Sequence, residues 1–218
     1  MINKIKLQEN VEDYNAGNSI FIWDNAFDPK MFPAQNEMDF NFSNRSGQKG
    51  PGIISWVKNI LNWDSDDGSL EETIAKVEKE YDGAVEKYPF LDQSVQLIHT
   101  LAGPNFKMLR GWFNGQTFGL GDDIHRDVQL IDQELGQFVT FIFFCNHVWE
   151  NEWGGETLIY DPNYDALGAI TPRPGRMVAF DSRLLHKGHP PARHIVDLRL
   201  TFALHTFLEK PIKGKDGK

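Results

Sequence analysis

The chain has 218 residues and a formal net charge of −9 at pH 7, from 22 Lys and Arg against 31 Asp and Glu. So acidic a chain argues against nucleic-acid partners and anionic membranes, because both attract basic surfaces. The one cysteine, Cys145, cannot form an intrachain disulfide, which excludes the disulfide-rich secreted domains and is typical of a reducing compartment. The first residues lack the apolar stretch of a secretory signal, and the longest apolar run, 138–145, is too short to cross a bilayer. We therefore expect a cytoplasmic protein with no membrane partner.

The first half of the chain is predicted to consist mainly of helices and loops. A short apolar run at 20–23 predicts an edge strand. Residues 24–68 are rich in Asn, Asp, Gly and Pro and are predicted to be mostly loop, with a helix over 53–61.

Two further helices are predicted before residue 104. Ser69 and Glu72 have the spacing of a capping box, and the apolar residues behind them recur at helical intervals as far as Val85. The second helix covers 91–101 and is expected to end before Gly103, which is followed by proline.

The second half of the chain changes to the period of β-strands. The run 138–145 is apolar throughout, as in a strand that is buried on both faces. In 199–207 the residues alternate, so that the odd positions share one face and the even positions the other. The predicted strands are 105–113, 138–145, 155–161, 177–180 and 199–207. Short strands at close spacing predict a β-barrel or a double-sheet jelly roll.

The motif that carries chemistry is His125-Arg126-Asp127. On an extended chain, residues i and i+2 point the same way, so His125 and Asp127 can present an imidazole and a carboxylate to one point. With a third histidine they would form the facial triad of non-haem Fe(II) oxygenases, which leaves coordination positions open. A motif this short also occurs by chance, and the order of the segments that follow it is what favours the metal site.

From about Asn105 to Leu208 the chain resembles the double-stranded β-helix of 2-oxoglutarate and Fe(II)-dependent oxygenases, in particular their prolyl 4-hydroxylase-like branch. The matching segments are, in order, Trp112–Gly115, His125–Asp127, Phe138–Asn146, Trp153–Thr157, Arg176–Phe180, Leu185–Gly188 and Arg199–Thr201. The resemblance implies an α+β, mainly β fold. A jelly-roll or cupin-like core would cover 105–209, with 1–104 as helical support packed on it and 210–218 as a flexible tail, all in one structural domain.

The resemblance also implies roles for individual residues. His125, Asp127 and His186 match the three iron ligands, and Arg199 matches the basic residue that pairs with the distal carboxylate of 2-oxoglutarate. A guanidinium suits this task because it holds a carboxylate through two parallel hydrogen bonds. Thr201 lies on the same strand face and could donate a further hydrogen bond.

The third iron ligand has an alternative. Family members often place the basic residue about ten positions after this ligand. The gap to Arg199 is 199 − 189 = 10 from His189 and 199 − 186 = 13 from His186. We prefer His186 because the run LLHKG stands where the family has its histidine, and a variable loop can absorb three residues.

Other aromatic and polar residues have weaker assignments. Phe144 stands near a position where relatives often have a tyrosine that binds 2-oxoglutarate, so another group must donate that bond, or none does. Arg110 and Trp112 share a strand face and could line the substrate side, as could Trp153, although packing in the core explains them equally well. The remaining histidines, His205 among them, are interpreted as non-ligands.

The function implied by the resemblance is that of an Fe(II)- and 2-oxoglutarate-dependent dioxygenase, with O2 as co-substrate and ascorbate as a further candidate cofactor. It would hydroxylate an aliphatic C–H bond of peptidyl proline. Asp127 favours hydroxylation, because halogenases of this kind have a small residue at that position. Two alternatives stay open: a hydroxylase of a free amino acid or other small metabolite, and a non-enzymatic cupin-like binding module. A nucleic-acid demethylase fits least well with the charge of −9.

Overall fold

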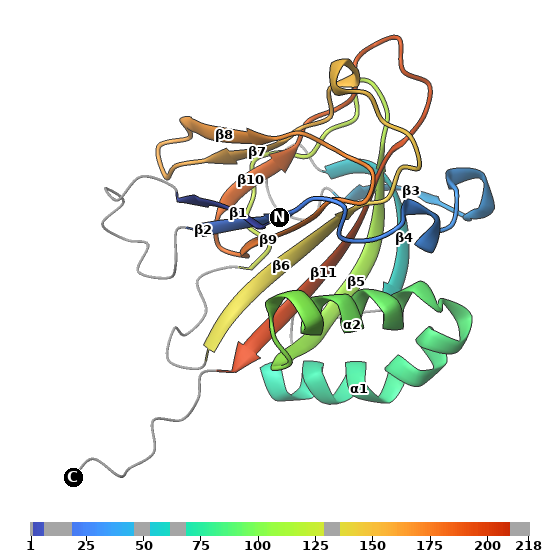
Figure 1. The fold of residues 1–218 in the computed structure, drawn as a ribbon, viewed down its shortest axis with the longest axis vertical. Coiled ribbons are helices and arrows are strands. Elements are labelled where there is room, and N and C mark those ends of the chain that lie inside the picture. Colours follow the sequence, from blue (N-terminus) through green and yellow to red (C-terminus); the bar gives the residue numbers. More distant parts are fainter. Residues whose placement is uncertain (1, 7–18, 46–52, 62–68, 129–135, 210–218) are drawn as a thin grey trace.

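The described residues form two antiparallel β-sheets with two α-helices beside them (Figure 1). The computed structural model describes residues 2–6, 19–45, 53–61, 69–128 and 136–209. The large sheet has eight strands in the order β1-β2-β9-β6-β11-β5-β4-β3, and the small sheet has the order β10-β7-β8. The strands are β1 (Ile2–Lys6), β2 (Ser19–Trp23), β3 (Asn41–Arg45), β4 (Ile53–Leu61), β5 (Phe106–Gln116), β6 (Gly136–Phe144), β7 (Thr157–Tyr160), β8 (Ala166–Ile170), β9 (Met177–Asp181), β10 (Leu185–Gly188) and β11 (Arg199–Glu209). This mainly-β architecture confirms the predicted fold class.

Strand β11 lies at the centre of the large sheet, and its two faces have different tasks. It pairs with β5 on one side and with β6 on the other. Its even residues Leu200, Phe202 and Leu204 belong to the main hydrophobic core. Its odd residues, from Arg199 to His205, face the small sheet and the segment that carries His125. The alternation predicted for 199–207 is therefore confirmed.

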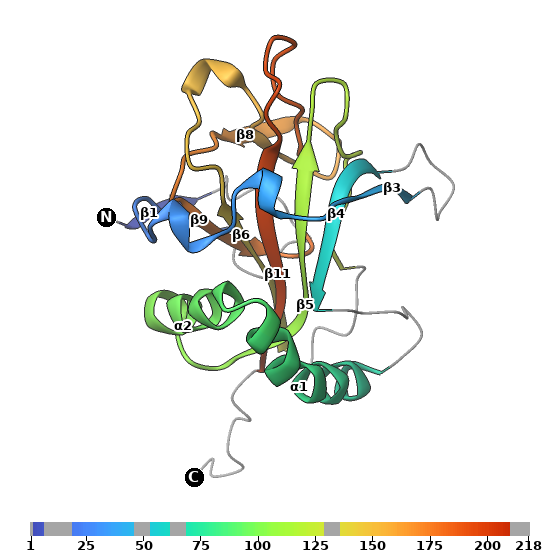
Figure 2. The ribbon, with the colours of Figure 1, turned by 90° about the vertical axis from the view of Figure 1, so that its right-hand side faces the viewer.

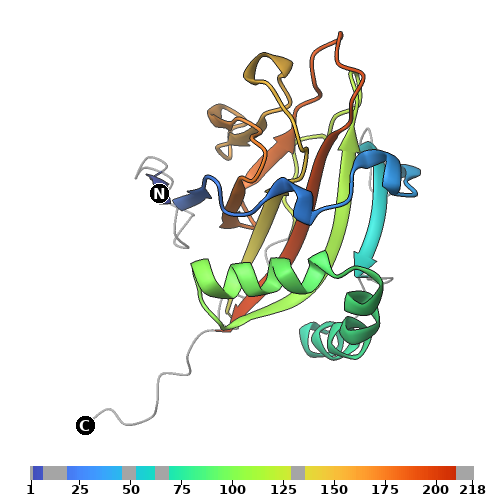
Figure 3. The same ribbon diagram turned by 45° about the vertical axis from the view of Figure 1, so that its right-hand side comes forward.

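The two helices cover the outer face of the large sheet (Figures 2 and 3). Helix α1 (Leu70–Lys87) starts with the predicted capping box, in which the Ser69 N–H donates to Glu72 at 2.8 Å and the Glu72 N–H donates to the Ser69 hydroxyl oxygen at 3.2 Å. Helix α2 (Phe90–Ala102) ends, as predicted, at Gly103, whose φ of 120° suits glycine.

The core between α2 and the large sheet is built largely of aromatic rings. Phe32 is 1% exposed, and its ring centroid lies 5.3 to 5.8 Å from five neighbouring rings: Phe27, Phe90, Phe113, Phe143 and Phe202. Such edge-to-face and tilted contacts fill space densely. This packing anchors the N-terminal region on the barrel.

The helical prediction for 53–61 is wrong. These residues form β4, which pairs with β3 and β5. A register shift between Asn59 and Leu61 breaks the alternation of burial, so the apolar residues mimic helical spacing. Their β-branched side chains suit a strand, and pairing with β5 decides the conformation.

The N-terminal half is also less helical than predicted, because β1 to β4 belong to the large sheet. Strand β2 confirms the predicted strand at 20–23, but it lies between β1 and β9 and not at the sheet edge. Two short 3₁₀ turns, Pro29–Met31 and Gln35–Glu37, follow it. The division into 1–104, 105–209 and 210–218 stays a prediction, and its tail lies outside the described residues. In the described part of the chain, no helix has both the length and the apolar character needed to cross a membrane.

Candidate active site

The site forms where the segment between β5 and β6 meets the start of β10. His125 and His186 exchange two backbone hydrogen bonds, each of 3.0 Å from N–H to carbonyl oxygen. The backbone N–H of Asp127 donates to Ser182 at 2.9 Å. These main-chain bonds bring together residues that are about 60 positions apart in the sequence.

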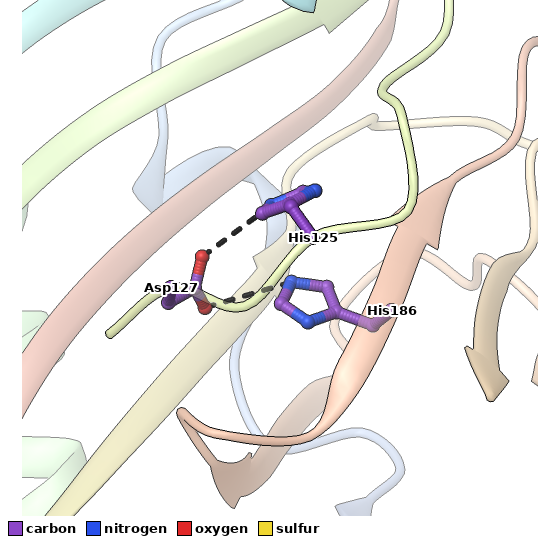
Figure 4. Close-up of side chains that lie close together, drawn as sticks. All are labelled: His125, Asp127 and His186. Atoms are coloured by element: carbon purple, nitrogen blue, oxygen red, sulfur yellow. Dashed lines mark ion pairs between the residues drawn. The ribbon is translucent and has the colours of Figure 1, made fainter. Parts of the chain in front are cut away.

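The side chains of His125, Asp127 and His186 converge on one point (Figure 4). His125 Nε2 is 3.5 Å from Asp127 Oδ1, and His186 Nε2 is 3.5 Å from Asp127 Oδ2. One ligand atom from each residue lies within 4.8 Å of the other two. Two imidazoles and one carboxylate are the donor set of a facial triad.

Both histidines are oriented by their second ring nitrogen. Nδ1 of His125 is 2.7 Å from the carbonyl oxygen of Asp123, and Nδ1 of His186 is 2.9 Å from that of Leu184. A carbonyl only accepts, so each Nδ1 carries a proton, and in the neutral imidazole Nε2 is the nitrogen with a lone pair for a metal. The residues therefore fit a divalent iron ion.

The geometry separates the two candidates for the third ligand. His186 is 5% exposed and its ring points at Asp127. His189 is exposed, lies beyond β10, and donates its backbone N–H to Glu156 at 2.8 Å. The group of converging donors thus includes His186 and not His189.

The electrostatics of the three side chains differ although they touch. Burial would lower the pKa of His125, but the nearby carboxylate of Asp127 outweighs it and raises this pKa to about 9. In His186 burial dominates over the attraction of Asp127 and lowers the pKa to about 4. Burial opposes ionisation of Asp127 as well, yet the surrounding imidazoles hold its pKa well below the usual range.

Arg199 lies on the same face of β11 as His205, the residue that contacts Asp127. Three hydrogen bonds fix its guanidinium. Nε donates to the carbonyl oxygen of Gly155, Nη1 to Gln116 Oε1 at 3.0 Å and Nη2 to Thr157 Oγ1 at 2.8 Å. The residue is 3% exposed, and burial lowers the pKa of its guanidinium to about 10, so that it is charged at neutral pH. A buried cation fixed in this way is suited to bind a carboxylate.

The chain around Arg199 is fixed by side chains from distant segments. Asn146 donates from Nδ2 to Leu198 O and accepts from the Leu200 N–H through Oδ1, both at 2.7 Å. Gln35, from the N-terminal half, accepts the Leu198 N–H at 2.8 Å. The start of β11 is therefore bound on both sides of the arginine.

Two glycines make room for the cradle of Arg199, by which we mean the residues that bind its guanidinium: Gly155, Gln116 and Thr157. Gly155 has a φ of +82°, and a Cβ added there would lie 2.9 Å from Arg199 Cδ. A Cβ on Gly188 would lie 2.8 Å from both amide atoms of Gln116 and 2.9 Å from Asp122 Oδ2. Side chains at either position would displace the arginine or its partner.

The remaining predicted residues lie around this site. Thr201 is buried on the face of β11 that carries Arg199, and Phe144 places its ring 5.5 Å from the guanidinium carbon. Arg110 stacks on Trp112 at 3.9 Å, and Trp153 packs against Trp149 with 5.3 Å between ring centroids. Trp112 contacts the His205 ring, so it belongs to the inner face of the barrel.

Sequence reasoning missed several residues of the site. His205 is outside the group of converging donors, in line with its interpretation as a non-ligand, but its Nε2 is 3.2 Å from Asp127 Oδ2. The alternation of β11 was a signal, because it places His205 on the same face as Arg199. Three other residues have no such signal in the sequence, because only strand pairing places them in the site. Thr140 donates a hydrogen bond to Asp127, and Gln116 and Thr157 accept hydrogen bonds from Arg199.

Asp122 is a further buried acidic group close to the site. Burial raises the pKa of its carboxyl, against the attraction of His125 and Arg199. Its Oδ1 has no hydrogen-bond partner among the described residues. It places a buried carboxyl group beside His125 and Arg199, which interact with it electrostatically.

Comparison with known proteins agrees with the donor set. Residues 113–205 match the family model described as the 2OG-Fe(II) oxygenase superfamily. This segment contains the three converging side chains as well as Arg199 and His205. A search of curated proteins found no match.

Solved structures share the fold at low sequence identity. One is a prolyl hydroxylase in complex with a hypoxia inducible factor oxygen degradation domain peptide fragment from Trichoplax adhaerens, with a TM-score of 0.50, 16% identity, and coverage of 86% of this chain and 83% of that one. Another is an oxidoreductase of the 2OG-Fe(II) oxygenase family from Burkholderia pseudomallei, with a TM-score of 0.50, 9% identity, and coverage of 79% and 74%. A prolyl-4-hydroxylase from Pseudomonas putida has a TM-score of 0.49, 14% identity, and coverage of 88% and 92%.

The two solved structures with a TM-score of 0.50 confirm the double-stranded β-helix. The family match and the converging donors identify Fe(II) as the cofactor and 2-oxoglutarate and O2 as the co-substrates, because the superfamily uses them. Ascorbate stays a prediction. The match over residues 113–205 and the converging donor set together indicate a 2OG-Fe(II) oxygenase, a non-haem iron dioxygenase.

Proposed function

We propose that the protein hydroxylates an aliphatic C–H bond, and that its substrate is a prolyl residue in a peptide. The observation that carries the proposal is the convergence of His125, Asp127 and His186 beside a strand whose inner face also bears Arg199. The first three residues would hold Fe(II), and Arg199 would hold the distal carboxylate of 2-oxoglutarate.

The side chains of the site have separate tasks. His125, Asp127 and His186 would supply the three donors of a facial triad, an arrangement that leaves coordination positions open for small molecules. When bound, iron and 2-oxoglutarate supply the oxidation, in which 2-oxoglutarate and O2 give succinate and CO2 and one oxygen atom enters the C–H bond.

Arg199 would orient the co-substrate through the N–H groups that are not already bound within the protein. A guanidinium has five N–H groups, and three of them already bind Gly155, Gln116 and Thr157. The two that remain suit a carboxylate held by two hydrogen bonds. Phe144 supplies an apolar wall beside the guanidinium, and such a wall excludes water and strengthens the pairing.

The similarity in fold to a peptide-bound prolyl hydroxylase supports the choice of a peptide substrate. It is support by analogy, because one fold can carry many substrates. A free amino acid or another small metabolite is the alternative outcome of the test below.

The test has two stages. First, Fe(II) and 2-oxoglutarate are added to the full-length protein without oxygen, and the visible charge-transfer band of the chelate is recorded. We expect the band in the wild type and in Glu78→Gln, a surface carboxylate on α1 that serves as control, and its loss in Asp127→Ala. Absence of the band in the wild type at saturating 2-oxoglutarate would rule out the proposed chemistry.

Second, succinate release is measured in air against proline-containing peptides, the same peptides with alanine for proline, and free amino acids. Stimulation by proline peptides alone, with a mass gain of one oxygen atom on the peptide, supports the proposal. Stimulation by a free amino acid but by no peptide would replace the peptide substrate with a small molecule and leave the oxygenase chemistry intact.

A further inference from the structure

The two carboxylate oxygens of Asp127 have different surroundings. Oδ2 is 2.6 Å from Thr140 Oγ1 and 3.2 Å from His205 Nε2. Each oxygen also lies 3.5 Å from one imidazole, Oδ2 from His186 Nε2 and Oδ1 from His125 Nε2, and both distances are longer than a good hydrogen bond. Each carboxylate oxygen has about two lone-pair sites, and Thr140 donates to Oδ2 while His205 Nε2 lies beside the same oxygen.

Thr140 is one link of a directed chain of hydroxyl groups. Its Oγ1 is 2.8 Å from the Ser182 hydroxyl and 2.6 Å from the Asp127 carboxylate. A carboxylate can only accept, so Thr140 donates to Asp127 and must accept from Ser182. The backbone carbonyl of Ser182 also accepts the Asp127 N–H at 2.9 Å, so Ser182 fixes both the main chain and the side chain of this residue.

His205 approaches the same oxygen from the neighbouring strand. It is 4% exposed, and its ring is packed edge-on against Trp112 with 4.5 Å between centroids. Its Nε2 lies 3.2 Å from Oδ2, so a proton on this nitrogen would face the carboxylate, although the contact does not have the geometry of a hydrogen bond. The ring is too tightly enclosed to turn away without moving Trp112.

Thr140 and His205 are direct cross-strand partners in the β6–β11 pair. Both strands are central in the eight-stranded sheet, whereas Asp127 lies on the segment between β5 and β6. Rigid strands therefore hold a ligand that itself comes from a connecting segment. Groups held by regular structure are positioned more accurately than groups held by loops.

We propose that Thr140 and His205 are positioning residues that clamp Asp127 through Oδ2, so that the carboxylate binds iron through Oδ1 alone. The inference rests on the proposed metal site and goes beyond it, because neither residue touches the metal. A carboxylate without the clamp can turn and bind through both oxygens, which would occupy a position that 2-oxoglutarate or O2 needs.

The experiment uses Co(II) alone, with no 2-oxoglutarate and no substrate, and the full-length protein freed of metal. Binding is followed by calorimetry and by the visible d–d absorption of Co(II). Two pairs of variants separate the donor from the side-chain volume: Thr140→Val against Thr140→Ser, and His205→Leu against His205→Gln. The matched control is Thr206→Val, which removes a buried hydroxyl on the other face of β11 that donates to Val139 at 2.9 Å.

We expect Thr140→Val and His205→Leu to bind Co(II) about 10- to 100-fold more weakly, with a changed d–d band. Thr140→Ser, His205→Gln and Thr206→Val should keep the wild-type band and an affinity within about threefold of wild type. Unfolding midpoints are measured with and without Co(II), and each variant is compared with its own metal-free midpoint, so that a loss of stability is not mistaken for a loss of binding.

Two results would overturn the clamp. Either donor-lacking variant could bind Co(II) with unchanged affinity and spectrum, or His205→Gln could lose as much affinity as His205→Leu, which would make His205 a metal ligand. Failure of the wild type to bind Co(II) at all would overturn the metal site itself, and it is distinguishable because no variant is involved.

Discussion

Replacement of Arg199 by lysine should separate the orientation of 2-oxoglutarate from the charge that attracts it. The guanidinium donates to Gly155, Gln116 and Thr157 and has two N–H groups left. A lysine ammonium has three N–H groups in all, so it cannot satisfy the same three acceptors and also bind a carboxylate. The charge is kept, and the paired hydrogen bonds are lost.

The expected loss of affinity for 2-oxoglutarate follows from the strength of the lost hydrogen bond. A hydrogen bond to a charged group contributes about 1.5–3 kcal/mol. Loss of that amount corresponds to about 10- to 150-fold weaker binding of 2-oxoglutarate. Acceptors left without a donor should also lower the free energy of unfolding by about 1–3 kcal/mol each.

The assay is an anaerobic titration of the Fe(II)-loaded protein with 2-oxoglutarate, followed through the chelate band. Affinity for Co(II) alone is measured in parallel and should stay within about threefold, because Arg199 is not a metal ligand. Arg176→Lys is the matched control, since it removes another buried guanidinium that binds Asp24 and Thr171 away from the site. If Arg199→Lys kept its affinity for 2-oxoglutarate within about twofold, the assignment of Arg199 would be wrong.

Three further predictions concern the metal, the cradle and the core. Without metal the pKa of His125 is about 9 and that of His186 is about 4, so metal binding at pH 7 should release about one proton. The affinity for the metal should then rise by up to about tenfold per pH unit below pH 9. Calorimetry in buffers of different ionisation enthalpy measures the number of protons released, and a number near zero would contradict the prediction. Gly188→Ala places a methyl group 2.8 Å from the Gln116 amide and should weaken 2-oxoglutarate binding much more than Co(II) binding, so equal losses would refute the cradle. Phe32→Ala should cost about 3–5 kcal/mol in urea-induced unfolding, and a loss below about 1 kcal/mol would show that the ring cluster is not the core.

Features that depend on short-range sequence patterns could be predicted from the sequence alone. The capping box at Ser69 and the end of α2 at Gly103 are local, because the groups that make them are at most a few residues apart. The alternation in 199–207 fixed the two faces of β11 for the same reason. The motif His125-Arg126-Asp127 and the order of the later segments were enough to predict that these two side chains converge with His186.

The tertiary structure decided whatever depends on strand pairing. The segment 53–61 has apolar spacing that fits a helix, and only pairing with β3 and β5 makes it a strand. The choice of His186 over His189 depends on the two backbone bonds to His125, which no spacing rule contains. His205 lies in the site because the register of β11 and β6 places it opposite Thr140 and in contact with Asp127. Contacts of this kind join residues far apart in the chain, and their energy exists only once the sheet has formed, so single-segment patterns cannot report them.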